Sequence, residues 1–245
     1  MLTIHRVVEE CERDHDITWA SFRGLLDAIA ASGAPTETEL LRSPLTETAT
    51  VALTFDDGTS DHAGVAQELA RREMRGIFFI PAGKVGTRGR LGTQQLQEIH
   101  ALGNTVGSHG CDDVLLDETL SPWEITHEMR DSKQQLEDAL GAPVRYFAPP
   151  GGRMGGLSAG AFLRHGYEAS RSMAWGIYRS VEERWTIPSI PVTEFTLARG
   201  WVEHAVRAHT LPLAMRCMWI LKDLLPEAVR LPVRKMLHQP FKLTR

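Results

Sequence analysis

Two adjacent carboxylates after an apolar segment are the first residues whose types and spacing could do chemistry. Asp56 and Asp57 directly follow residues 50–55 (TVALTF) and precede Gly58. Neighbouring carboxylates that leave a buried segment are both stable only when one of them meets a cation or a proton. Gly58 permits a sharp backbone turn at this point. We therefore expect one of the two carboxylates to meet a metal ion, another cation or a proton; in the plainer interpretation, both are solvated in a turn after a strand.

A histidine and a carboxylate spaced by four residues follow a second short apolar segment. His109 and Asp113 come after residues 105–108, and one helical turn would bring their side chains together. Joined by Asp57, they would form an open three-ligand metal site of one imidazole and two carboxylates. The alternative is that His109 is a core histidine bonded to the backbone and that Asp112 and Asp113 cap the next segment.

The third candidate is residues 146–152 (YFAPPGG), in which two prolines precede two glycines. Prolines fix an extended backbone, and glycines let main-chain N–H groups approach a ligand closely. Pro150 and Gly151 are therefore predicted to line a substrate groove, with an N–H near Gly151 facing a developing oxyanion. A rigid loop without a ligand is the alternative.

Strand-like and helix-like segments alternate around these residues, which is typical of β/α units on a parallel sheet. We find no internal repeat or linker, and 245 residues suit one α/β barrel, whose chemistry sits at the carboxyl ends of its strands. The predicted strands are residues 2–8, 50–55, 76–80, 105–108, 144–148, 168–172 and 189–192, and the predicted helices are residues 18–31, 62–72, 93–102, 121–140 and 157–165.

Taken in order, residues 54–58 (TFDDG), 108–113 (SHGCDD) and 147–152 (FAPPGG) resemble the polysaccharide deacetylase family, that is, the NodB-homology domain of carbohydrate esterase family four. Residues 4–7 (IHRV) and 187–192 (IPSIPV) are similar to a branch that processes exopolysaccharides, and the resemblance covers about residues 1–195. It implies a single distorted β/α barrel and a metal-dependent hydrolase that removes an N-acetyl or similar acyl group from an amino sugar or glycan intermediate. It also implies that Asp56 is the catalytic base and that Asp57 and His109 are metal ligands.

The sequence departs from the family's signatures at several positions. Asp113 stands where the second signature has a histidine, and Ala148 stands where the third usually has an arginine that positions the base. The Asp-Trp dyad and the Leu-x-His signature have no clear match. An Asp57–His109–Asp113 set can still bind a divalent ion, Zn, Mn, Co or Fe, and its extra carboxylate shifts the preference from Zn²⁺ toward the other three.

Two further roles are assigned from position alone. His5, at the end of the first predicted strand, is the candidate general acid, with His204 and His209 as alternatives. Trp175 is a candidate stacking face for a sugar ring, or else a core residue.

The charge is unevenly distributed along the chain. The net charge is −4, but residues 211–245 hold seven basic and two acidic residues, a net of +5 that leaves −9 for residues 1–210. We therefore predict a deacetylase-like barrel over residues 1–210 and a basic helical extension over 211–245, packed on the barrel, on a partner or peripherally on a membrane. An acidic body without clustered arginines and aromatic residues argues against nucleic acid.

The first residues, MLTIHRVVEECERDHD, do not resemble a signal peptide. The expected location is therefore the cytoplasm, at or near the membrane, and the expected substrate is an acetylated sugar intermediate, with a lipid-linked form included. Two other functions remain open. The chain could be a catalytically degenerate barrel that binds a glycan or partner without hydrolysis, or a metal-dependent hydrolase of a non-sugar amide, an imide or a formylated sugar.

Overall fold

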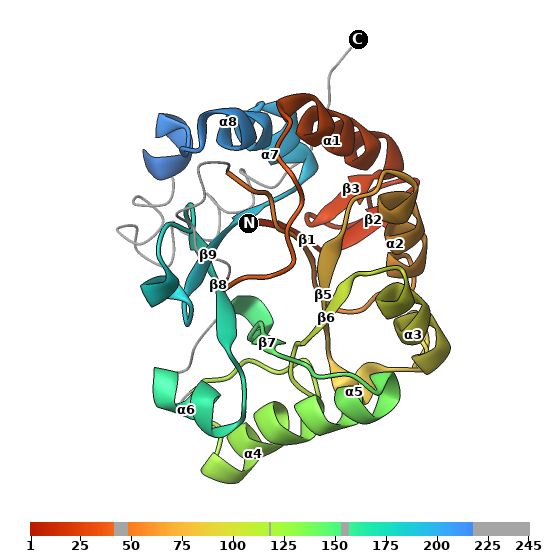
Figure 1. Ribbon diagram of the computed structural model, residues 1–245, viewed down its shortest axis with the longest axis vertical. Helices are drawn as coiled ribbons and strands as arrows, with labels where there is room; N and C mark the ends of the chain where they lie inside the picture. The colour runs from red at the N-terminus through yellow and green to blue at the C-terminus, as the bar shows by residue number, and fades with distance from the viewer. Residues whose placement is uncertain (42–48, 118, 153–156, 218–245) are drawn as a thin grey trace.

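Seven parallel strands close into a barrel in this computed structural model, which describes residues 1–41, 49–117, 119–152 and 157–217. The helices lie around the outside of the strands (Figure 1), so the predicted single β/α barrel is confirmed. In order around the barrel the strands are β1 (Leu2–Ile4), β4 (Leu53–Phe55), β5 (Gly76–Ile80), β6 (Thr105–Ser108), β7 (Tyr146–Phe147), β8 (Ala169–Trp175) and β9 (Ile187–Pro191), which pairs with β1.

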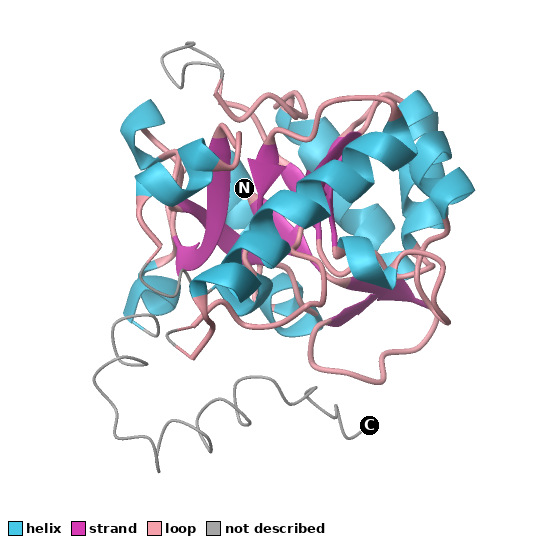
Figure 2. Cartoon of the chain, turned by 90° about the horizontal axis from the view of Figure 1, so that it is seen from below, coloured by secondary structure: helices cyan, strands magenta, loops and turns pink. Residues whose placement is uncertain are grey.

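Figure 2 shows the helices lying over the strands. In α1 (Trp19–Ser32), the Thr18 hydroxyl caps the Ser21 N–H and Gly33 ends the helix with a φ of 71°. The others are α2 (His62–Arg71), α3 (Thr93–Ala101), α4 (Pro122–Thr126), α5 (Ser132–Leu140), α6 (Ala159–Arg164), α7 (Glu194–Ala198) and α8 (Trp201–Ala208), with short 3-10 turns η1 (Ala82–Lys84), η3 (Pro150–Gly152) and η4 (Val181–Glu183). Helices α1, α2, α3, α5, α6 and α8 each bury apolar side chains in the layer between helices and barrel.

The first predicted strand, residues 2–8, is wrong as one element. It divides into β1 of the barrel and β2 (Arg6–Val8), which pairs with β3 (Asp16–Thr18) in a separate two-stranded sheet. The division falls at His5, whose carbonyl accepts a hydrogen bond from His62 Nε2 at 2.6 Å. The Asp61 carboxylate then accepts the Val7 N–H at 2.8 Å. His62 in α2 and Asp61 just before it thus bond backbone groups that a neighbouring barrel strand would otherwise bond. The chain therefore leaves the barrel directly after β1.

The predicted helix over residues 121–140 forms, but with a wider turn in its middle. The expected capping box is present, with Ser121 capping the Glu124 N–H. Between α4 and α5 lies a π-helical segment, η2 (His127–Asp131). The Ser132 hydroxyl donates to the Glu128 carbonyl at 2.5 Å, so a side chain satisfies a backbone group where the regular helical ladder is interrupted.

The core has two parts, which alternate along the strands. On β5, Phe78 and Ile80 point outward into the layer that the helices cover, while Ile77 and Phe79 point into the barrel. The barrel interior is filled by Ile77, Phe79, Tyr146, Ala148, Ala169 and Ile187. Because these side chains fill the barrel, it is a packed core rather than a channel, and ligands must bind at its rim.

Only residues 211–217 of the predicted C-terminal extension belong to the described part of the chain. Helical residues 213–217 follow α8, and residues 218–245 lie outside the described residues, so the division at residue 210 stays a prediction. Within the described part of the chain, no helix has the length and apolarity needed to cross a bilayer.

Candidate active site

Three neighbouring parts of the barrel deliver polar residues to one rim. β1 pairs with β4, and β5 lies between β4 and β6, all in parallel. Because parallel strands end at the same edge, the residues that follow them meet there. His5 follows β1, Asp56 follows β4 and His109 follows β6. The predicted placement at strand ends is therefore confirmed.

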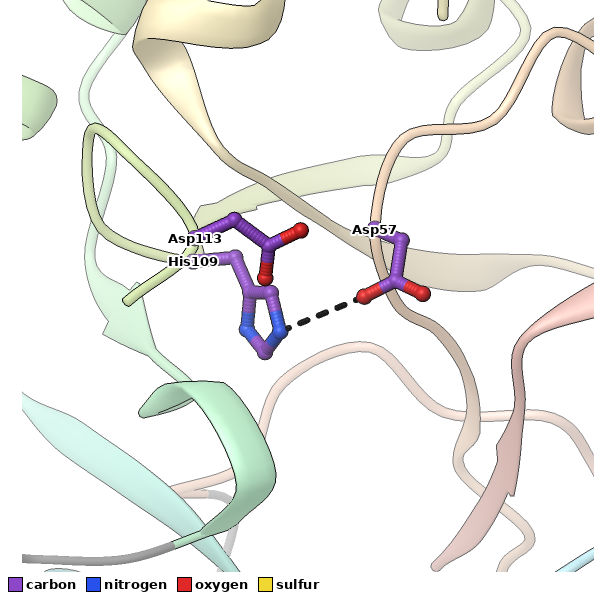
Figure 3. A group of neighbouring side chains, drawn as sticks. All are labelled: Asp57, His109 and Asp113. Atoms are coloured by element: carbon purple, nitrogen blue, oxygen red, sulfur yellow. Dashed lines mark ion pairs between the residues drawn. The ribbon is translucent and has the colours of Figure 1, made fainter. Parts of the chain in front are cut away.

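Asp57, His109 and Asp113 lie together, as Figure 3 shows, with Asp57 on one loop and the other two on the loop after β6. His109 Nε2 lies 3.5 Å from Asp57 Oδ1. One potential ligand atom from each of the three lies within 4.8 Å of those of the other two. Asp113 Oδ2 also forms an ion pair with Arg90 Nη2 at 3.2 Å. The structure thus brings together the three residues proposed as a metal set.

The backbone that achieves this differs from the predicted helical turn. The loop from His109 to Asp113 is not helical, because Gly110 has a φ of 77° and Asp113 a φ of 61°. Asp57 also has a positive φ, 73°. Non-glycine residues in this region are uncommon and cluster at functional sites. Left-handed residues on both loops, rather than one helical turn, turn the two carboxylates toward the imidazole.

The orientation of His109 is fixed by a backbone carbonyl. Its Nδ1 lies 2.6 Å from the Ala148 carbonyl oxygen, and the side chain is buried. A carbonyl only accepts, so Nδ1 carries the proton and donates it. Nε2 therefore faces Asp57, which is the arrangement found in metal-ligating histidines.

Asp57 and His109 stabilise each other's charged forms. Burial alone would raise the pKa of Asp57, but the hydrogen bond and charge of His109, with His5 and Arg90, hold that pKa well below its usual range. Burial alone would lower the pKa of His109, but Asp57 and Asp56 raise it overall. The cluster attracts positive charge at this point. Two carboxylates and an oriented imidazole are a donor set that fits a divalent metal ion.

Asp56 has one anchored and one free carboxylate oxygen. The residue is 3% exposed, and its Oδ2 lies 2.5 Å from Arg171 Nη2 and 3.9 Å from His5 Nε2. Its buried Oδ1 has no hydrogen-bond partner among the described residues. A buried carboxylate oxygen without a partner is costly unless it serves a ligand or a reaction. Oδ1 is therefore the atom that can accept a proton.

The contact of Arg171 with Asp56 was not predicted, because the family's signature has its arginine at position 148, where this chain has alanine. A signal was present: Ala169, Arg171 and Met173 alternate along β8, so an arginine that shares the inward face of a barrel strand must have a buried partner.

His5 is the best placed of the three candidate acids. Its side chain is 22% exposed, approaches Asp56 and stacks on His15 with ring centroids 5.0 Å apart. His204 lies on α8 and His209 follows it, in the outer layer of helices. Of these three histidines, all within the described residues, only His5 contacts Asp56.

The predicted substrate-binding residues occupy different surroundings. Gly151, with a φ of 62°, is exposed, and a Cβ there would lie 2.7 Å from Leu115 Cδ2, so this loop packs against the one after His109. Pro150 is buried. Trp175 ends β8 and is partly buried against the outer core. Pro150 and Gly151 therefore lie beside the metal-ligand loop, and the roles of all three residues stay predictions.

A second group, Asp112, His127 and Glu128, also has ligand atoms within 4.8 Å of one another. These atoms have protein partners: His127 Nδ1 lies 3.0 Å from Asp131, and Glu128 accepts the Cys111 N–H at 2.7 Å and the Asp112 N–H at 3.2 Å. We interpret the role of this group as structural: it links the π-helical turn to the loop after β6 by hydrogen bonds.

Comparisons with known proteins bear on the family and the fold. Bacillus subtilis YxkH, which carries the name of a polysaccharide deacetylase, is 27% identical over 119 residues, covering 48% of this chain and 42% of its own. The chain thus matches less than half the length of this curated relative.

Two solved structures show the same fold. Streptococcus pyogenes deacetylase PplD, in complex with acetate, superposes with a TM-score of 0.72 at 20% identity, over 78% of this chain and 91% of its own. IcaB from Ammonifex degensii gives 0.72 at 23% identity, over 84% and 95%. The polysaccharide deacetylase family matches residues 44–170, just over half of the chain, and the chain belongs to that family.

Proposed function

We propose that this chain is a metal-dependent hydrolase that removes the N-acetyl group of an amino sugar within a glycan or glycan intermediate. Membership of the family supports deacetylation of glycans. The observation that carries the finer proposal is the buried Oδ1 of Asp56, which has no hydrogen-bond partner among the described residues. Asp56 directly precedes Asp57, which groups with His109 and Asp113. A protein that only bound a glycan would not need this buried, charged arrangement.

Asp57, His109 and Asp113 would hold the metal. When bound, a divalent ion supplies Lewis-acid polarisation of the acyl carbonyl and lowers the pKa of water at the site. With two carboxylates in the set, Mn²⁺, Co²⁺ or Fe²⁺ is favoured over Zn²⁺. The Ala148 carbonyl keeps His109 Nε2 turned toward the other ligands.

The remaining residues move protons. Asp56 Oδ1 accepts a proton from the attacking water, and His5 Nε2 donates one to the leaving amine. His5 approaches the other oxygen of Asp56, so base and acid lie on adjacent strand ends. A main-chain N–H near Gly151 would stabilise the negative charge that develops on the acyl oxygen.

The substrate proposed here is an acetylated amino sugar or glycan, with lipid-linked intermediates included. The basic residues of 211–245 support the lipid-linked form and contact with an anionic membrane. Such contact would hold the protein at the membrane surface where a lipid-linked sugar is found.

Release of acetate from short N-acetylated hexosamine oligomers, with Mn²⁺, Co²⁺, Fe²⁺ or Zn²⁺ supplied, tests the proposal. Asp56→Asn should lower kcat by about 100-fold or more, because it removes the base while nearly preserving shape. The matched control is Asp138→Asn, a carboxylate on α5 hydrogen-bonded to Gln134, which should retain wild-type activity. Absence of acetate release by the wild type with every metal, or full activity of Asp56→Asn, would contradict the proposal.

A further inference from the structure

We propose that Arg171, from the middle of β8, is the positioning residue of the base Asp56. It sets the direction of the Asp56 carboxylate and keeps His5 free to act as the acid. The inference rests on the deacetylase function proposed above.

The two side chains form a buried ion pair. Arg171 Nη2 lies 2.5 Å from Asp56 Oδ2, with Arg171 completely buried and Asp56 3% exposed. Taking a guanidinium out of water is costly, and a well-packed apolar side chain in its place is often as stable or more stable. A purely structural need of the barrel interior therefore does not explain an arginine here.

The guanidinium is held by partners other than Asp56. Nη1 donates to Thr3 Oγ1 at 3.2 Å and lies 3.0 Å from Met173 Sδ, and the group lies over the Phe79 ring, 5.5 Å from its centroid. Thr3 is itself bonded by Thr54 Oγ1 at 3.2 Å. The position of Nη2 is thus set by three strands of the barrel, β1, β5 and β8. Such a fixed donor can hold a carboxylate in one orientation.

This contact divides the two oxygens of Asp56. Arg171 takes Oδ2, and Oδ1 is left buried without a partner among the described residues. His5 Nε2 is 3.9 Å from Oδ2, beyond hydrogen-bond distance. Without Arg171, His5 would be the side chain left within 4.0 Å of Oδ2 among the ion pairs of the described residues. Asp56 would then turn toward it, and both proton-transfer groups would be engaged with each other.

Position 148 offers a way to separate the effect of the Arg171 charge from the effect of its packing. Ala148 lies in the barrel interior with Phe79, the residue over which Arg171 stacks. It directly follows β7, which pairs with β8. An arginine introduced at 148 would enter the same interior space. The double variant Arg171→Ala/Ala148→Arg therefore moves the cation without removing it.

The experiment compares kcat and KM of the metal-loaded full chain with crystal structures of the same proteins. Arg171→Met should lower kcat by about 100-fold, the cost of a misplaced reacting group, and should leave KM nearly unchanged. Arg171→Lys, the double variant, and guanidinium ion added to Arg171→Ala should each restore part of kcat. The matched control is Arg145→Met, an arginine that pairs with Glu39 and lies over the Tyr146 ring outside the site, and it should keep wild-type kcat.

In the crystal structure of Arg171→Met, the Asp56 carboxylate should be turned toward His5. An unchanged Asp56 carboxylate, or wild-type kcat in a folded Arg171→Met, would overturn the inference. If Arg171→Met does not fold, Arg171→Ala serves as the reference instead. If neither Arg171→Lys nor guanidinium added to Arg171→Ala then gives more activity than Arg171→Ala alone, the inference is also overturned. A wild type inactive on every acetylated sugar would refute the proposed function instead, and the orientation of Asp56 in the crystals would still decide the role of Arg171.

Discussion

Arg90 ties together the two loops that carry the candidate metal ligands. Its Nη2 lies 3.2 Å from Asp113 Oδ2, and its Nη1 donates to the main-chain carbonyl of Asp57. Both aspartates have positive φ, so each depends on its surroundings to hold an uncommon backbone conformation. One guanidinium therefore supports the set from both sides.

Loss of this support should weaken metal binding. Arg90→Met is expected to raise the dissociation constant for Mn²⁺ by about 10–100-fold, as is usual when the partner of a ligating carboxylate is removed. Isothermal titration calorimetry measures the change. The control is Arg88→Met, an exposed arginine of the same loop, whose affinity should equal that of the wild type. Equal or tighter binding by Arg90→Met would show that its charge opposes the metal more than its contacts help.

Metal affinity should fall as the pH is lowered. In the metal-free protein the pKa of His109 is raised and that of Asp57 lowered, so the histidine is the group that holds a proton in the mildly acidic range. Metal binding needs the neutral imidazole and must release that proton. Titrations in buffers of different ionisation enthalpy should detect the release. An affinity that stays constant between about pH 6 and 8 would contradict it.

In the metal-free protein the same pair predicts the opposite trend for stability. The contribution of His109 is present at low pH and lost as the pH rises through its raised pKa. The contribution of Asp57 is present above the ordinary carboxylate pKa and lost only as the pH falls through its lowered pKa. Stability curves of metal-free protein should therefore show a loss on the alkaline side that His109→Gln abolishes.

Two glycines should respond oppositely to alanine. At Gly107 on β6, a Cβ would lie 2.6 Å from Phe79 Cδ1 and 3.1 Å from the Tyr146 carbonyl oxygen, so Gly107→Ala should cost about 1–3 kcal/mol by overpacking. Gly24 is exposed within α1, with nothing within 4 Å of the added atom, so Gly24→Ala should add about 0.5–1 kcal/mol. Urea unfolding measures both, and a neutral Gly107→Ala would show that the interior has spare room.

Basic residues of the C-terminal extension should promote binding to anionic vesicles. Changing Lys222, Arg230, Arg234 and Lys235 to glutamine in the full chain should weaken sedimentation with phosphatidylserine-containing vesicles, by about 1 kcal/mol per charge that lies near the surface. Binding to neutral vesicles should not change. If the wild type ignores anionic vesicles, the membrane proposal is wrong.

Most of the fold was predictable because its signals are local. The GIFFI run of β5, the Ser121 cap and the stop at Gly33 each act within a few residues, and all were found. The division of the first strand at His5 was not, because it depends on His62 and Asp61, which are distant in sequence. Periodicity carries no information about such contacts.

In the candidate site, too, the residues carried by local motifs were predicted and the contacts between distant residues were not. Asp56, Asp57, His109 and Asp113 were named from motifs, and the barrel gathers them at one rim. The helical turn expected after His109 was wrong, because Gly110 and Asp113 adopt left-handed conformations. Arg90 and Arg171 were missed, since each acts through a partner that only the folded chain brings near.

The most direct test of the account is the metal content of purified protein, measured by elemental analysis for the wild type, Asp113→Ala, Asp113→His and the neighbouring control Asp112→Asn. We predict about one divalent ion per chain in the wild type, Asp113→His and Asp112→Asn, and its loss in Asp113→Ala. Of these two aspartates, Asp113 is the one that lies with Asp57 and His109 in the proposed ligand set. A metal-free wild type, or metal retained in Asp113→Ala and lost in Asp112→Asn, would contradict the proposed site.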